Sequence, residues 1–291
     1  MKAVNLRELK EIRLNRLCPL VFALSLSVLT AACGTNAANN APDAAVADLT
    51  VLPPDLTPPP VPPNLGCLDG GAPPAVPAMI TVSGKVNNPL NKNMDVSGTL
   101  VEAFAAGQMM AVTSTTAPAD GSFAIHLTTG GNPWQGYLKI TKAADATVIP
   151  VYLYAAAPLR ADITGASVPV LRHDDLSVFS NIAQVTPEKD KSTLFIIVRD
   201  CVQKPVEAAT VMVSPMAGST KLVYFTNVAG APVPSRNATA TSKDGVAVAF
   251  NVPPDGMGHA TVTANWQGTP FLANTVGAWA DSLVVMFVEP R

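Results

Sequence analysis

Short runs in which apolar and polar residues alternate dominate the chain beyond residue 78. Side chains of a β-strand point alternately to opposite faces, so this alternation indicates a strand with one buried face. A first group of runs spans residues 79–86, 96–105, 109–116, 121–127 and 136–143. A second group spans residues 192–200, 209–215, 220–227, 237–252, 259–266 and 282–290. We therefore expect an all-β chain with two β-sandwich modules in tandem.

A helical period separates the two groups of strands. Leu176, Phe179 and Ala183 follow the i, i+3, i+7 spacing of an amphipathic helix. Asp174 and Asp175 stand just before them, where negative charge suits the helix dipole. The pattern predicts a short helix over residues 174–184, which we expect to connect the modules and to pack one face on a sandwich.

The two groups also share a turn. Asp120-Gly121 precedes an apolar run in the first group, and Asp244-Gly245 does so in the second. This dipeptide predicts a hairpin because the turn needs positive φ, which glycine adopts freely and aspartate tolerates. Its presence at matching points of two units indicates a duplication.

The first 32 residues predict a signal peptide. Residues 1–16 are basic on balance, and residues 17–29 carry no charge. At about 1.5 Å per residue the uncharged run covers roughly 20 Å, short of the ~30 Å hydrocarbon core of a membrane. A basic segment followed by a short apolar one is typical of a signal peptide rather than of a spanning helix.

The end of this segment, "LTAAC", resembles the lipobox of bacterial lipoproteins, with Ala31 and Ala32 before Cys33. Thr30 departs from the leucine that is more usual in that family. The resemblance implies cleavage before Cys33 and acyl chains such as palmitate on it, which would anchor the protein in a membrane. Gly34, rather than aspartate, follows Cys33, and in this the chain resembles the lipoproteins that are directed to the outer membrane. An ordinary secretory signal that leaves Cys33 free is the alternative.

Residues 33–66 are rich in alanine and proline and lack aromatic side chains. Such a segment buries too little apolar surface to offset the entropy of ordering, so we expect a disordered tether. Its proline-rich part favours extended polyproline II, which would hold the folded modules away from the lipid. The repeats "DLTVLPP" and "DLTPPP" resemble the spacers of myxobacterial lipoproteins.

The second module resembles a carboxypeptidase regulatory-like domain through "IIVRDCVQKPVEAATVMVSP" and "TSKDGVAVAFNVPPDG". This resemblance implies a transthyretin-like sandwich. Gln203 and Ala208 stand where the family prefers glycine, and the first module is a looser match. The expected organisation is a first module over residues 67–160, a connecting segment over 161–191 and a second module over 192–291.

Charge and motifs narrow the function. With a formal net charge of −2 and 14% charged residues, the chain offers no basic surface for nucleic acid. Its histidines, His126, His173 and His259, show no zinc-binding spacing, and no nucleophile elbow, P-loop or dinucleotide motif occurs. We read His173 and the two aspartates after it as a helix start rather than a metal site. We expect no catalysis, metal or cofactor; a cryptic hydrolase is the enzymatic alternative.

Two cysteines remain for the folded part, because Cys18 would leave with the signal peptide and Cys33 would carry the lipid. An even pair in an exported protein favours a disulfide between Cys67 and Cys201. It would join the start of the first module to the end of the first strand of the second. Two separate buried thiols are the alternative.

Aromatic residues near turns are candidates for binding. Trp134, Tyr137 and Trp266, with Trp279 as a further turn-flanked indole, would suit a glycan or an envelope protein as ligand. Burial in the core is the alternative, because small sandwiches need large apolar side chains. The sequence thus predicts a non-catalytic, lipid-anchored envelope protein with a structural or adhesive role. A carbohydrate-binding accessory protein that works with a separate enzyme is the second interpretation.

Overall fold

Strands account for most of the regular structure in the computed structural model, which describes residues 59–69, 73–228 and 231–290. The signal peptide, Cys33 and the tether up to residue 58 lie outside the described residues. No helix among the described residues is long and apolar enough to cross a membrane.

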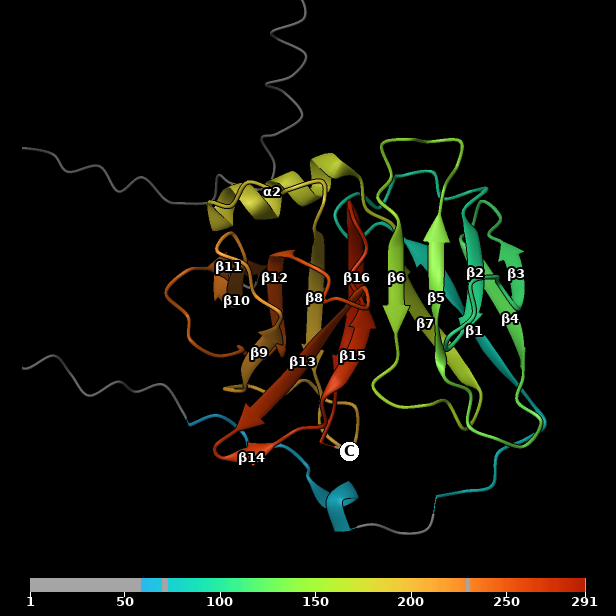
Figure 1. Cartoon of the computed structure of the whole chain (residues 1–291), viewed down its shortest axis with the longest axis horizontal. Coiled ribbons are helices and arrows are strands. Elements are labelled where there is room, and N and C mark those ends of the chain that lie inside the picture. The colour runs from blue at the N-terminus through green and yellow to red at the C-terminus, as the bar shows by residue number, and fades with distance from the viewer. Residues whose placement is uncertain (1–58, 70–72, 229–230, 291) are drawn as a thin grey trace, which may run out of the picture. The chain divides into compact units, whose positions relative to one another are not determined.

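The first module is a sandwich of two sheets (Figure 1). One sheet has the order β4-β1-β7, and β1 pairs antiparallel with β4 and parallel with β7. The other has the order β6-β5-β2-β3. The strands are β1 (Met79–Asn87), β2 (Leu100–Ala105), β3 (Thr113–Thr116), β4 (Ser122–Thr128), β5 (Gly136–Thr141), β6 (Val151–Tyr154) and β7 (Ile163–Pro169).

The second module repeats this topology. β8 pairs antiparallel with β12 and parallel with β16, as β1 does with β4 and β7. β13 lies between β9 and β15, as β5 lies between β2 and β6. The strands are β8 (Ser192–Val198), β9 (Thr210–Ser214), β10 (Lys221–Val228), β11 (Ala231–Ser235), β12 (Val246–Val252), β13 (His259–Trp266), β14 (Thr269–Pro270), β15 (Asn274–Gly277) and β16 (Ser282–Val288). The predicted fold class, two sandwiches in tandem, is confirmed.

One boundary differs from the prediction. β7 lies within residues 161–191, which we expected to be only a connection, yet it pairs with β1 and completes the first sandwich. The first module therefore extends to Pro169. The sequence hides this strand because most of its side chains are exposed and Gly165 interrupts it with a positive φ of 71°.

The two modules share one sheet. β6, at the edge of the first module, pairs parallel with β16 of the second, which creates a nine-stranded sheet. Successive side chains of a strand point to opposite faces. On β16, Leu283 and Val285 pack into a first core, whereas Val284 and Met286 pack into a second. The first core lies against β1, β4 and β7, and the second lies under β9, β13 and β15, so the cores occupy opposite faces of the shared sheet.

Helix α2 (His173–Ala183) confirms the predicted helix to within one residue at each end. Asp175 caps it by accepting a hydrogen bond of 2.8 Å from the backbone N–H of Arg172. Phe179 packs edge-on against Phe195 of β8, with ring centroids 5.8 Å apart. The helix thus packs into the first core on this side of the second module. Figure 1 shows it above the ends of β8 and β12.

The two Asp-Gly turns are structurally equivalent, but the predicted hairpins are wrong, because β3 and β4 lie in different sheets and β11 pairs with β10 rather than with β12. Gly121 has φ of 74° and Gly245 has φ of 65°. Their carbonyl oxygens accept hydrogen bonds from the N–H groups of Val86 and Val198, at 2.7 and 2.8 Å. A Cβ atom would lie 2.3 Å from the Val86 oxygen at the first turn and 2.5 Å from the Val198 oxygen at the second. Both turns need glycine, for its conformation and for the close approach of the first strand.

Candidate binding site

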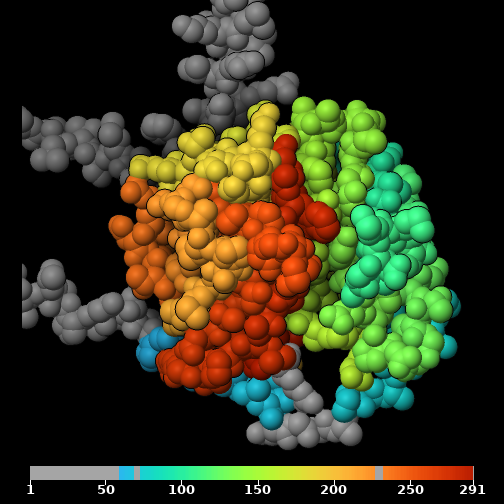
Figure 2. Space-filling model, in the orientation of Figure 1, coloured from blue at the N-terminus to red at the C-terminus, as the bar shows by residue number. Residues whose placement is uncertain are grey.

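An aromatic surface lies where the second core ends. The sheet β9-β13-β15 covers the second module's half of the nine-stranded sheet and stops at β15. Beyond that edge, Phe104, Tyr137, Tyr152 and Tyr154 project from β2, β5 and β6 on the face opposite the first core, and Trp279 follows β15. We call these five residues the aromatic trough. Figure 2 looks onto this side, where the orange and red covering strands end beside the green surface of β5 and β6.

The rings of the trough stack on one another. Tyr137 lies between Phe104 and Tyr154, with ring centroids 5.2 and 5.0 Å away and interplanar angles of 5° and 28°. Tyr152 stacks on Trp279 at 5.0 Å and 17°. The indole of Trp279 also lies close to Gly277, where an added Cβ would lie 2.6 Å from it, and 37% of the surface of Trp279 remains exposed. Both faces of Tyr137 are therefore covered, whereas Trp279 has one stacked neighbour and is partly exposed.

Burial keeps the tyrosines neutral. It raises the pKa of Tyr137, with the Glu102 carboxylate adding to the shift, and it raises the pKa of Tyr152. The pKa of Tyr154 is raised to about 12 by burial, although hydrogen bonds from Gly277 and Trp279 oppose the shift. All three hydroxyls therefore stay protonated at neutral pH and can donate hydrogen bonds.

A cavity of about 380 Å³ opens at one end of the trough. Tyr137, Tyr154 and Trp279 line it, together with the β15 segment and the β2–β3 and β12–β13 loops. Met109 and Met257 stand on these loops with 96% and 78% of their surface exposed. Methionine is a flexible apolar side chain that adapts to varied partners. The cavity has the size range of natural ligand sites and an apolar rim.

The free edge of β15 forms one wall of this cavity. The N–H of Gly277 points away from β13, because it donates a 3.0 Å hydrogen bond to the Tyr154 hydroxyl. Backbone groups of every second residue in an antiparallel strand point the same way. The N–H and C=O of Thr275 therefore also face away from β13, and no described strand pairs with them.

The structure separates the aromatic candidates. Tyr137 lies in the trough. Trp134 is only 8% exposed and packs into the first core, as the core alternative expects, although it also lines the cavity. Trp266 is half-buried against the second core at the end of β13 opposite His259, and its indole N–H has no hydrogen-bond partner among the described residues. Trp279, rather than Trp134 or Trp266, joins Tyr137.

Tyr152 and Tyr154 are site residues that sequence reasoning missed, because the strand that carries them was not predicted. The signal was present as "VYLY", residues 151–154, which consists of β-branched, aromatic and leucine residues. A strand of only four residues is easily missed by a search for alternation.

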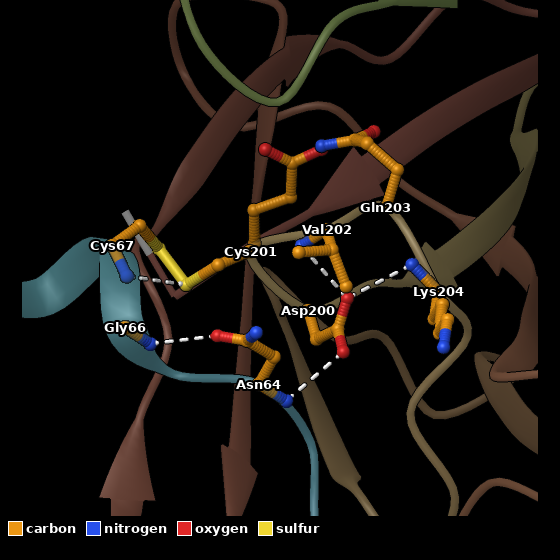
Figure 3. The surroundings of a disulfide bond; sticks show 9 residues. Asn64, Gly66, Cys67, Asp200, Cys201, Val202, Gln203 and Lys204 are labelled. Carbon is orange, nitrogen blue, oxygen red and sulfur yellow. Dashed lines mark hydrogen bonds between the residues drawn. A yellow bond between two sulfur atoms is a disulfide. The ribbon is translucent and has the colours of Figure 1, made fainter.

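The predicted disulfide is confirmed between Cys67 and Cys201, which are 134 positions apart (Figure 3). The N–H of Cys67 also donates to the Cys201 sulfur at 3.0 Å. Nearby, the N–H of Asn64 donates to the Asp200 carboxylate at 2.9 Å, and the N–H of Cys201 donates to the Asn64 carbonyl at 2.9 Å. The end of the expected tether, residues 64–66, is therefore ordered on the second module, because these bonds and Leu65 packing on the second core offset its entropy.

The histidines stay apart. His126 contacts Thr81 on β1, His173 begins α2 and lies 3.7 Å from the Asp281 carboxylate, and His259 begins β13. No group of three or more potential ligands gathers into a metal site among the described residues.

Comparisons with known proteins return distant likenesses. No family model matches the sequence, and no curated protein matches it. The TIE protein of Bacillus anthracis is 11% identical with a TM-score of 0.25, covering 73% of this chain and 33% of that one. A streptococcal ancillary pilin is 10% identical with a TM-score of 0.22, covering 74% and 63%. The shaft pilin SpaA of Lactobacillus rhamnosus GG is 11% identical with a TM-score of 0.23, covering 73% and 98%.

This chain thus spans a third of the length of the first of these proteins and 63% of the second. At such low TM-scores and identities, the likenesses carry no conclusion about the function of this chain.

Proposed function

We propose that the chain is an exported, non-catalytic protein of the bacterial cell envelope, anchored in the outer membrane by a lipid on Cys33. Its two sandwiches would act as structural or adhesive modules. The lipobox-like "LTAAC" and the tether after it support this role. Two or more acyl chains on one cysteine give stable membrane attachment.

The disulfide between Cys67 and Cys201 is the observation that carries the proposal. Disulfides persist in oxidising compartments outside the cytosol and are rare within it. A structural disulfide between two segments this far apart in sequence therefore supports export, independently of the signal peptide.

The place of the disulfide also suits an anchored protein. The tether reaches the folded part at Asn64 and Cys67, where it is bonded to Asp200 and Cys201, directly after β8. β8 lies inside the nine-stranded sheet, between β12 and β16. Tension on the tether would pass through a covalent bond to this central strand, so the first module would stay outside the loaded path.

We also propose that the modules are carboxypeptidase regulatory-like domains. The two residues that depart from the glycines of that family, Gln203 and Ala208, have φ of 65° and 61°. Glycine adopts this left-handed conformation without steric cost. The backbone at both positions supports the resemblance although the side chains differ.

Mass spectrometry of the N-terminal peptide tests the anchor. The full chain would be expressed in a bacterium with lipoprotein processing, and its membranes separated by density. We expect a mature N-terminus at Cys33 with acyl chains, in the outer-membrane fraction. In the matched Cys33→Ser variant the acyl mass should disappear and the protein should leave the membrane. An unacylated wild-type N-terminus, or one at another residue, would refute the anchor.

A further inference from the structure

We propose that the aromatic trough binds an extended, uncharged peptide segment of a partner protein, which adds to the free edge of β15 as a further strand of the covering sheet. This inference names a partner class for the proposed adhesive role. It does not depend on the lipid at Cys33.

The backbone of β15 provides the first support. Thr275 is exposed, and its N–H and C=O face the trough without a strand partner among the described residues, whereas Gly277 is buried and its N–H already donates to the Tyr154 hydroxyl. An exposed edge of this kind pairs with extended peptides through main-chain hydrogen bonds. A strand of four residues spans about 13 Å, so a segment of roughly four residues would pair with it.

The floor of the trough provides the second support. A strand added beside β15 would lie over β6 and β5, as β15, β13 and β9 lie over the second module's half of the same sheet. Every second side chain of the peptide would point toward Tyr137, Tyr152 and Tyr154. Side chains from two facing sheets interdigitate in this way in β-sandwiches. The exposed Met109 and Met257 stand at the cavity rim to cover apolar side chains of the peptide.

The charges of the trough favour a neutral segment. Glu102 and Lys139 face each other across β2 and β5, so they compensate each other, and the titratable residues that line the cavity are His259 and the neutral Tyr137 and Tyr154. A sugar is the less favoured ligand. Stacking on a sugar needs an open ring face, and both faces of Tyr137 are covered by neighbouring rings, while Trp279 already stacks on Tyr152.

The experiment titrates the whole purified protein with a blocked hexapeptide of alternating threonine and valine and follows the amide resonances of Thr275 and Gly277. We expect both resonances to shift. A second hexapeptide has the same side chains and N-methyl groups at alternate residues, on the edge that would face β15. It should bind at least about tenfold more weakly, because it lacks the donors for this edge.

Two variants separate backbone from side-chain effects. Thr275→Pro removes the N–H that faces the trough but no bond to β13, and proline is tolerated on edge strands. It should weaken hexapeptide binding about tenfold, whereas Thr275→Val, which keeps the N–H, should bind as the wild type does. If Thr275→Pro lowers the melting temperature too far, the comparison of the two peptides on the wild-type protein still decides.

Two outcomes would overturn the proposal. One is equal binding of the N-methylated and unmodified peptides. The other is a response of Thr275 and Gly277 to a chitin-type oligosaccharide together with no response to the hexapeptide, which would make the trough a glycan site. Neither outcome bears on the anchor, which is tested by the N-terminal mass alone.

Discussion

The two modules share a topology but differ in how their sheets are covered. In the second module, the β12-β8-β16 sheet has α2 and the first core on one face and the β9-β13-β15 sheet on the other. In the first module, the β2-β5-β6 sheet has the first core on one face, and its other face carries the trough. There, among the described residues of this sheet, only Tyr152 and Tyr154 of β6 pack against the edge of the second core. The sequence of each strand reflects this difference. β8 reads "STLFIIV" with almost every side chain buried, whereas β5 reads "GYLKIT" and alternates.

The joint between the modules, where β6 pairs with β16, explains this difference in coverage. Each sandwich has two sheets and contributes one of them to the joint. The first module contributes the sheet β6-β5-β2-β3, and the second contributes the sheet that contains β12, β8 and β16. This choice places the two cores on opposite faces of one sheet and, among the described residues, leaves the trough without a covering strand beside β15. An aromatic face without a covering strand is therefore a consequence of joining two similar sandwiches edge to edge.

The largest expected effect tests whether the modules are energetically separate. Ile125 in the first core and Ile196 in the second are 1% and 0% exposed. Ile125→Ala and Ile196→Ala should each cost about 2–5 kcal/mol through lost burial and a cavity. Because β16 contributes to both cores, calorimetry should show one shared transition that moves down in both variants. Two transitions, each sensitive to one substitution, would show that the joint does not couple the modules.

Removal of the disulfide should have the next largest effect. It links the segment before the first module to the second module, so it closes a loop of 134 positions. Cys67→Ser with Cys201→Ser should lower the free energy of unfolding by about 2–4 kcal/mol. Denaturant titration with and without reductant measures this loss. The double variant is its own control, because reductant should no longer change its stability; an undiminished reductant effect would contradict the assignment.

Substitution of the equivalent turn glycines should reveal how similar the modules are. Gly121→Ala and Gly245→Ala each place a Cβ against a carbonyl oxygen at positive φ, so each should cost about 1–3 kcal/mol. Gly130→Ala is the matched control, because Gly130 has φ of 59° but no atom within 4 Å of an added Cβ. The loss of stability at Gly130, subtracted from the losses at Gly121 and Gly245, leaves the cost of the contact between the added Cβ and the carbonyl oxygen. Losses at Gly121 and Gly245 no larger than at Gly130 would argue against the close approach.

Much of the fold could be predicted because burial is local in sequence. The run over residues 259–266 is identical to β13, and α2 follows its apolar spacing. β7 and β6 could not be found in this way, since β7 is exposed along most of its length and β6 is short. The shared sheet could not be predicted either, because the pairing of β6 with β16 joins residues about 130 positions apart and leaves no local pattern in the sequence.

The candidate site could be predicted only in part for the same reason. The sequence identifies Tyr137 and Trp279 as aromatic residues next to turns, but their contact depends on the joint between the modules. Trp134 and Trp266 have similar sequence surroundings, yet Trp134 packs into the first core beside the cavity and Trp266 packs against the second core. A turn next to an indole does not reveal which face of a sheet the indole reaches. The disulfide was predictable from cysteine number and export, without any knowledge of the fold.

The smallest expected effect concerns a pair of equivalent positions, one in each module, that carry glycine in the first module and alanine in the second. Gly98 and Ala208 occupy equivalent places: each has positive φ, 75° and 61°, and each donates its N–H to a carbonyl, of Ala117 and Thr241 respectively. Alanine pays a steric cost in this conformation that glycine avoids.

Ala208→Gly should therefore stabilise the protein by about 0.5–1 kcal/mol, and Gly98→Ala should destabilise it by a similar amount. An added Cβ at Gly98 meets no atom within 4 Å, so backbone strain alone accounts for the expected loss. Chemical denaturation of both variants and of the double variant measures the exchange. The double variant should return to wild-type stability within error, because the two sites lie in different modules and share no partner. Destabilisation by Ala208→Gly would show that the alanine methyl group contributes packing that outweighs the strain, and the two positions would then not be equivalent.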